Sequence, residues 1–274
     1  MAAVPTADRL AATGPRILAV SNQKGGEGKT TTAVNLAASL AAAEHRVLLI
    51  DMDPQANASS SVGYGRGQVD RGTYELLLGH APLAEVIRAT ELATLSVVPA
   101  SADLAGAEVE LVGLDEPQTM LRRALAPLRA ELASRFEFVV LDCPPSLGML
   151  TVNSLVAADS VLIPMQAKYF SLEGLGALQG TIASIRAALN GTLAIEGILF
   201  CMFDPRTNLS QQVVKEVREH FAGLVYDTMI PINVRLSESP SHGKPALLYD
   251  IESRGAQAYL ELAREVLSRM EARA

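Results

Sequence analysis

Short apolar runs recur along this chain and are separated by longer stretches with the spacing of amphipathic helices. The runs that read as buried strands cover residues 16–21, 46–50, 95–99, 138–141, 160–163, 195–202 and 225–230. Helical patterns lie between most of them, at residues 31–43, 118–134, 172–189, 210–221 and 255–272. Strands that are apolar on both faces and alternate with helices predict an α/β fold, a mainly parallel twisted sheet with helices on both faces.

Length and composition restrict the fold and the class of protein. With 274 residues, 49% of them hydrophobic, the chain can bury one large α/β core. We expect a disordered extension over residues 1–15, which contain no long apolar run, and a single domain over residues 16–274. No apolar stretch is long enough to span a membrane, and Cys143 and Cys201 lie in apolar contexts typical of buried thiols. These features predict a cytoplasmic protein.

The charge of the chain bears on its partners. The formal net charge is −7 and the pI is about 5.2. Such an acidic balance argues against wholesale coating by nucleic acid, although it does not exclude a local basic patch. The distribution of the basic residues therefore decides whether nucleic acid is a partner.

A glycine-rich loop, KGGEGKT at residues 24–30, joins the first strand-like run to the first helical pattern. In the order strand, loop, helix, the backbone N–H groups of such a loop turn toward a phosphate and the helix N-terminus adds partial positive charge. We expect Lys29 to reach the β- and γ-phosphates and Thr30 to ligate magnesium through its hydroxyl. The nucleotide contacts predicted here are Lys24, Gly25, Gly26, Glu27, Gly28, Lys29, Thr30 and Thr31. The alternative is a glycine turn that only connects two elements.

Two residues of the loop need separate arguments. Lys24 stands at the entrance, where it cannot easily reach the phosphates that Lys29 serves, so its natural target is a nucleotide held by another subunit; the alternative is a solvated surface lysine. A Glu27 carboxylate about 6 Å from a phosphate charge would cost about 2–3 kcal/mol at an effective dielectric constant near 20. We therefore expect the Glu27 side chain to point outward.

Three aspartates follow strand-like runs and complete the predicted nucleotide site. Asp51 and Asp53 follow the run at 46–50, so that one carboxylate can organise magnesium while the other orients an attacking water. Asp142 ends the run at 138–141, as a rigidly held magnesium-site carboxylate requires. The alternatives are helix-capping and turn-forming aspartates.

Together these segments resemble the deviant Walker A (ParA/MinD) family of P-loop ATPases, whose loop pattern is KGGxGKT. The resemblance implies ATP and Mg²⁺ as ligands and an entrance lysine that crosses the interface of an ATP-sandwich dimer. It assigns catalytic roles to Lys24, Lys29 and Asp53, with Asp53 orienting the water. The implied magnesium site is formed by Thr30, Asp51 and Asp142. Glu27 departs from the family, which usually has a small apolar residue there.

The C-terminal half narrows the resemblance to the chromosomal ParA (Soj-type) branch. The likeness runs from residue 16 to residue 267 and is carried by FDPRTNLS at 203–210 and by IPINVRLSESPSHGKP at 230–245. It implies DNA binding without sequence preference, through contacts to phosphates. The residues concerned are Arg206 and Arg235, with Lys215, Arg218 and Lys244 as helpers. Ile232 replaces a family arginine, and the alternative for all five is a solvated surface charge.

The resemblance implies a weak ATPase that dimerises on ATP, binds double-stranded DNA and is released when a ParB-type partner stimulates hydrolysis. Such a protein would be nucleoid-associated in the cytoplasm. The alternative is a MinD-like or cargo-positioning ATPase without DNA binding. The last helical pattern mixes Glu with Arg, which disfavours membrane targeting. The sequence leaves the cargo open, whether chromosome or plasmid.

Overall fold

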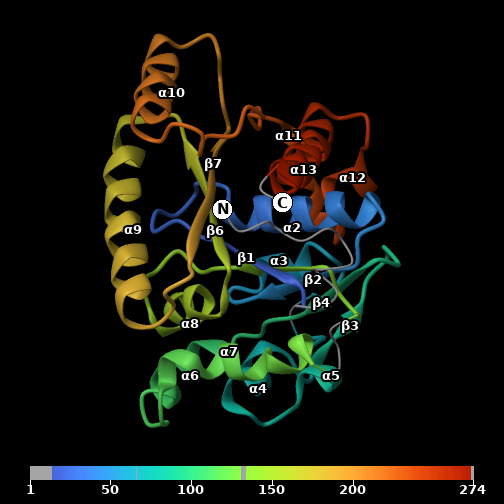
Figure 1. The fold of residues 1–274 in the computed structure, drawn as a ribbon. Helices are drawn as coiled ribbons and strands as arrows, with labels where there is room; N and C mark the ends of the chain where they lie inside the picture. Colours follow the sequence, from blue (N-terminus) through green and yellow to red (C-terminus); the bar gives the residue numbers. More distant parts are fainter. Residues whose placement is uncertain (1–13, 66, 131–133, 273–274) are drawn as a thin grey trace.

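The computed structural model describes residues 14–65, 67–130 and 134–272, and a seven-stranded sheet runs through its centre (Figure 1). The strand order is β3-β4-β2-β5-β1-β6-β7, and within the described residues only the β3–β4 pair is antiparallel. The mainly parallel sheet is therefore confirmed. The strands are β1 (Arg16–Val20), β2 (Val47–Asp51), β3 (Arg88–Ala89), β4 (Leu95–Val98), β5 (Phe138–Asp142), β6 (Ser160–Gln166) and β7 (Ala194–Cys201).

Helices cover both faces of the sheet (Figure 1). The longer helices are α2 (Lys29–Ala42), α6 (Leu104–Leu111), α8 (Met149–Ala157), α9 (Tyr169–Ala188), α10 (Asn208–His220) and α13 (Arg254–Ala272). The shorter ones are α3 (Asn57–Ser60), α4 (Thr73–Leu78), α5 (Leu83–Val86), α7 (Met120–Ala124), α11 (Val234–Glu238) and α12 (Ala246–Tyr249), with 3₁₀ turns η1 (Pro117–Thr119), η2 (Ala126–Arg129) and η3 (Ser239–His242).

Two hydrophobic cores explain why the strands are apolar on both faces. In β1, Leu18 and Val20 pack in the core that α2 and α13 cover. Ile17 and Ala19 point to the opposite core, which α6, α8 and α9 cover. Successive side chains of a strand alternate between faces, so a sheet covered on both sides needs a continuous apolar run.

Two elements expected from the sequence differ in the structure. Residues 225–230 do not form a strand, because the backbone N–H groups of Asp227 and Thr228 donate to the Glu265 carboxylate and only isolated bridges pair this segment with its neighbours. The single helix expected over residues 118–134 is not formed by its described part, and residues 131–133 lie outside the described residues. The helix α7 ends at Ala124 and a 3₁₀ turn follows, in which Pro127 lacks the N–H that a continued helix would need.

The N-terminal segment and the two cysteines can be compared with their predictions. Of the N-terminal extension expected over residues 1–15, Gly14 and Pro15 are buried, and the remainder lies outside the described residues. Cys143 and Cys201 are buried free thiols, as expected. Among the described residues, no helix has the length and apolar character needed to cross a membrane.

Candidate functional site

The glycine loop lies at the carboxyl end of β1 and leads directly into α2, as the sequence predicts. Gly26 and Gly28 have φ angles of 77° and 90°, which L residues with side chains rarely adopt. At Gly25 and Gly26 no described atom beyond the glycine and its two neighbours in the chain lies within 4 Å of the position that a Cβ would take. The backbone of the loop is therefore open on one side, next to the N-terminus of α2, which is the arrangement that anion binding requires.

Lys29 is the first residue of α2, and its side chain is nearly buried. Its Nζ donates to the backbone carbonyl of Lys24 at 2.9 Å, across the mouth of the loop. Burial lowers the pKa of Lys29, while the nearby charge of Asp142, and less strongly that of Asp53, opposes the fall. The structure therefore places Lys29 between the glycine loop and the acidic residues.

Asp51 and Asp142 end adjacent strands and are register partners in the β2–β5 pair. Both are fully buried. Asp51 accepts three hydrogen bonds: from Ser59 N at 2.8 Å and Ser59 Oγ at 2.6 Å on Oδ2, and from Asp53 N at 3.1 Å on Oδ1. These bonds fix the turn that carries Asp53. Burial raises the pKa of Asp51 to about 6.

Asp142 differs from Asp51 because neither of its carboxylate oxygens has a described donor in good hydrogen-bond geometry, although the Thr30 hydroxyl lies close enough to favour its charged form. Burial, followed by the charge of Asp51, raises the pKa of Asp142 well above its ordinary value, and the Thr30 hydroxyl and the Lys29 cation oppose the rise. A buried carboxylate without a donor is unfavourable unless a cation or its water shell completes it. The arrangement of Asp142 and Thr30 thus fits a divalent cation delivered with a phosphate group.

The expectation for Glu27 is wrong in one respect: the side chain does not point outward to solvent but is fully buried. It accepts hydrogen bonds from the backbone N–H of Gln166 and from Ser171 Oγ. Lys24 Nζ lies 3.3 Å from Glu27 Oε1, and the Lys24 side chain is 40% exposed. The prediction assumed that the charged Glu27 side chain could avoid the phosphate only by facing water. Instead, hydrogen-bond donors at the end of β6 and the start of α9 stabilise the carboxylate inside the protein.

Two cavities that the sequence analysis missed flank the start of α2. The first, of about 150 Å³, is lined by Gly28, Thr31, Cys201, Met202, Ile230, Pro231, Ile232, Asn233, Leu236, Ser237 and Tyr259. The second, of about 410 Å³, extends from Thr30 and Thr31 to Ser241 and Lys244. Many of these residues belong to the segments 24–30 and 230–245, which the sequence already marks, but only the fold shows that the two segments lie side by side at the loop.

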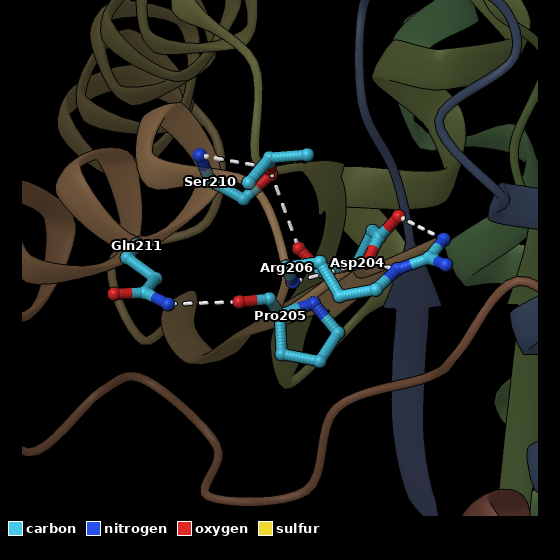
Figure 2. A network of polar contacts seen from close by, with 6 residues as sticks. Asp204, Pro205, Arg206, Ser210 and Gln211 are labelled. Atoms are coloured by element: carbon cyan, nitrogen blue, oxygen red, sulfur yellow. Dashed lines mark hydrogen bonds and ion pairs between the residues drawn. The ribbon is translucent and has the colours of Figure 1, made fainter.

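Each of the five basic residues expected to contact DNA forms an ion pair with an acid. The pairs are Arg206 with Asp204 (2.7 Å), Lys215 with Glu219 (3.9 Å), Arg218 with Asp227 (3.2 Å), Arg235 with Glu238 (2.8 Å) and Asp250 (3.1 Å), and Lys244 with Glu91 (3.0 Å). Figure 2 shows the Arg206 guanidinium against the Asp204 carboxylate, next to the first turn of α10. These bonds lower the pKa of Asp204 to about 2.

The five residues fall into separate groups. Arg206, Lys215 and Arg218 belong to α10 and the loop before it, whereas Arg235 belongs to α11. Lys244 follows η3 and lines the larger cavity together with Thr30, so it lies closer to the nucleotide site than the sequence comparison implied. The side chain of Arg206 is 86% exposed. Arg206 is therefore accessible to a large anionic partner.

The family model that matches the chain is described as an AAA domain and covers residues 15–195. The chain is 55% identical over 258 residues to the chromosome partitioning protein ParA of Myxococcus xanthus, across 94% of this chain and 90% of the relative. It is 50% identical over 251 residues to the sporulation initiation inhibitor protein Soj of Bacillus subtilis, across 92% of this chain and 98% of the relative.

Solved structures are similar as well. The structure of cobyrinic acid a,c-diamide synthase from Mycobacterium smegmatis, with bound ATP analogue and magnesium, is 34% identical, with a TM-score of 0.80. The similarity covers 94% of this chain and 96% of that protein.

Proposed function

This chain belongs to the ParA/Soj family of chromosome-partitioning ATPases, and on that premise we propose that it binds magnesium–ATP, dimerises around the nucleotide and binds DNA without sequence preference. ATP hydrolysis, accelerated by a ParB-type partner, would release the protein from DNA. The observation that carries the nucleotide part is the open glycine loop with Lys29 beside it, between the loop and the buried carboxylate of Asp142. The 34% identical protein with bound ATP analogue and magnesium supports the choice of ligand.

Each residue of the proposed nucleotide site would have its own role. The loop N–H groups and Lys29 would bind the phosphates, and Thr30 and Asp142 would hold magnesium, which neutralises charge on the phosphate oxygens. Asp51, whose oxygens already accept three hydrogen bonds, would hold Asp53 in place more than it would bind the metal. Asp53 would orient the attacking water, since its carboxylate stands on the turn that Asp51 fixes.

Asp53→Ala tests the assignment of the water-orienting carboxylate. The variant is expected to bind ATP and dimerise while hydrolysing ATP about 100-fold more slowly, the usual loss when a positioned acid–base group is removed. Phosphate release measured under single-turnover conditions checks this, with the exposed Asp115→Ala as a matched control. An unchanged hydrolysis rate in the Asp53 variant would show that another group orients the water.

The smaller cavity is the proposed site of the base. Met202, Pro231 and Ile232 offer apolar contacts, and the Asn233 amide can donate and accept hydrogen bonds. Gly28 and Thr31 line the same cavity, so a base bound there would continue directly from phosphates held by the loop. Ile232, which replaces a family arginine, thereby borders the nucleotide site.

DNA binding is proposed on the family relationship and on the exposed cations of α10 and α11. Each cation is paired with an acid, but exposed pairs contribute only about 0–1 kcal/mol, so a phosphate can compete for the cation. Lys215 and Arg218 also line a groove of about 430 Å³ with Phe203 and Gln211. Contacts of this kind read the phosphate backbone and carry no sequence information.

The double variant Arg206→Glu/Arg235→Glu is expected to weaken binding about equally for all DNA sequences. The slope of log affinity against log salt should shrink by roughly one unit per lost phosphate contact. ATP binding and dimerisation should persist. Titration of fluorescent duplexes at several salt concentrations checks this, with Arg71→Glu/Arg123→Glu as a control of equal charge change.

Two outcomes of that titration would contradict the assignment. If the control double variant weakens DNA binding as much as the Arg206/Arg235 variant, only the net charge matters and neither arginine marks a contact surface. If the Arg206/Arg235 variant no longer dimerises, the two arginines support the interface instead. The alternative function is a positioning ATPase for a membrane or protein cargo. It gains support if dimers form with ATP and none of the variants changes the affinity for DNA.

A further inference from the structure

Glu27 is a fully buried carboxylate within a loop that is expected to bind an anion. Two neutral donors, Gln166 N and Ser171 Oγ, hold it from the end of β6 and the first turn of α9, the latter at 3.0 Å. The amide of the Gln166 side chain also donates to the Gly26 carbonyl at 2.8 Å. The glycine loop and the connection between β6 and α9 are therefore joined by three hydrogen bonds.

The cation within ion-pair distance of this buried carboxylate is Lys24, with its Nζ 3.3 Å from Oε1. The two side chains differ in solvent exposure: that of Glu27 is fully buried, whereas that of Lys24 is 40% exposed. The Lys24 side chain can therefore rotate into solvent, whereas the Glu27 side chain is held in place inside the protein. If Lys24 leaves, the carboxylate stays buried with two neutral donors and only the weaker, more distant charge of Lys29, and a buried charge without an ion-pair partner is unfavourable.

We propose that Glu27 is a positioning residue that holds Lys24 on its own molecule and opposes the transfer of Lys24 to a phosphate bound by a second copy of the chain. The inference rests on the proposed function, in which Lys24 serves the nucleotide of the other subunit. Each protomer of a symmetric ATP dimer would have to break its own Lys24–Glu27 pair, so the effect counts twice per dimer. Glu27 thereby raises the protein concentration at which ATP dimers form.

Glu27→Gln tests the proposal, because it removes the charge while an amide oxygen can still accept from Gln166 and Ser171. Two readouts are needed: the rate at which Lys24 is acylated in nucleotide-free protein, followed by mass spectrometry, and the protein concentration of half-maximal dimer with a non-hydrolysable ATP analogue. We expect acylation to be about 3- to 5-fold faster, the upper range for loss of one partly exposed ion pair, and the dimer to form at about 10- to 25-fold lower concentration, because two pairs are broken per dimer.

Ser171→Ala is the matched control, since it removes a neutral donor from Glu27 and leaves the ion pair in place. Both readouts should stay within about twofold of the unmodified protein, a change below half a kcal/mol. Glu27→Val serves as a second variant if Glu27→Gln unfolds, and ATP titration of each variant verifies a competent loop. The expected changes for Glu27→Val have the same direction.

The outcomes separate this inference from the proposed function. Unchanged acylation of Lys24 in both Glu27 variants would overturn the inference, because the pair would then not restrain the lysine. Faster acylation with unchanged dimerisation would also overturn it, since the pair would exist without opposing the dimer. If the unmodified protein forms no ATP dimer at any concentration, the proposed function fails, and the inference fails with it.

Discussion

Lys29→Ala is expected to lower the affinity for ATP by about 100-fold or more, because a charge-assisted contact to phosphate contributes about 1.5–3 kcal/mol and this lysine would contact two phosphates. The fold should persist. Burial lowers the pKa of Lys29, so the protein is not stabilised by burying this cation, and the bond that is lost is the one from Nζ to the Lys24 carbonyl. Titration with a fluorescent ATP analogue, together with thermal unfolding, measures both.

Lys215→Ala is the matched lysine control for that titration. Lys215 lies on α10, is 79% exposed and lines a groove separate from the glycine loop, so its loss should leave ATP affinity unchanged. Ordinary ATP affinity in the Lys29 variant would remove the phosphate-binding interpretation of the glycine loop. Equal losses in both lysine variants would point to a general effect of charge.

Lys24→Ala is expected to abolish the ATP-dependent dimer while ATP still binds within a few-fold of normal. In a symmetric dimer each Lys24 would contact the nucleotide of the other subunit, so two charge-assisted contacts of about 1.5–3 kcal/mol are lost together. That loss corresponds to more than about 100-fold in the dimer dissociation constant. Light scattering with a non-hydrolysable ATP analogue measures it over a range of protein concentrations.

This variant needs its own control, because removing Lys24 also deprives the buried Glu27 of its ion-pair partner. The double variant Lys24→Ala/Glu27→Gln removes both charges. It should fail to dimerise as the single variant does, if the missing contact to the second nucleotide is the cause. Recovery of the dimer in the double variant, or a dimer of full strength in Lys24→Ala itself, would contradict the role given to Lys24.

Much of the fold could be predicted because burial on both faces imposes an unbroken apolar run. The run at 138–141 became β5, and the run at 46–50 became β2 with a shift of one residue. The run at 225–230 also begins and ends with apolar residues, but it contains Asp227 and Thr228, whose backbone N–H groups donate to Glu265 in α13. A local pattern cannot show which donors a tertiary contact will take.

The candidate site was also predicted only in part. The glycine loop and Asp142 could be found from the sequence, because the chemistry needs those residue types where a strand ends. The surroundings of Glu27 could not be predicted, since Gln166 and Ser171 lie 139 and 144 residues away from it in the sequence. Likewise, the pairing of Lys244 with Glu91 depends on how segments 153 residues apart pack together.

The central claim is that ATP switches this protein onto DNA of any sequence. The most direct test is retention of the purified protein on duplex DNA of random sequence, with magnesium–ATP or magnesium–ADP, at several salt concentrations. The account predicts retention with ATP and not with ADP, with similar affinity for unrelated sequences and a steady loss as salt rises. Dimers that form with ATP but are not retained on DNA, or retention that is the same with both nucleotides, would contradict it.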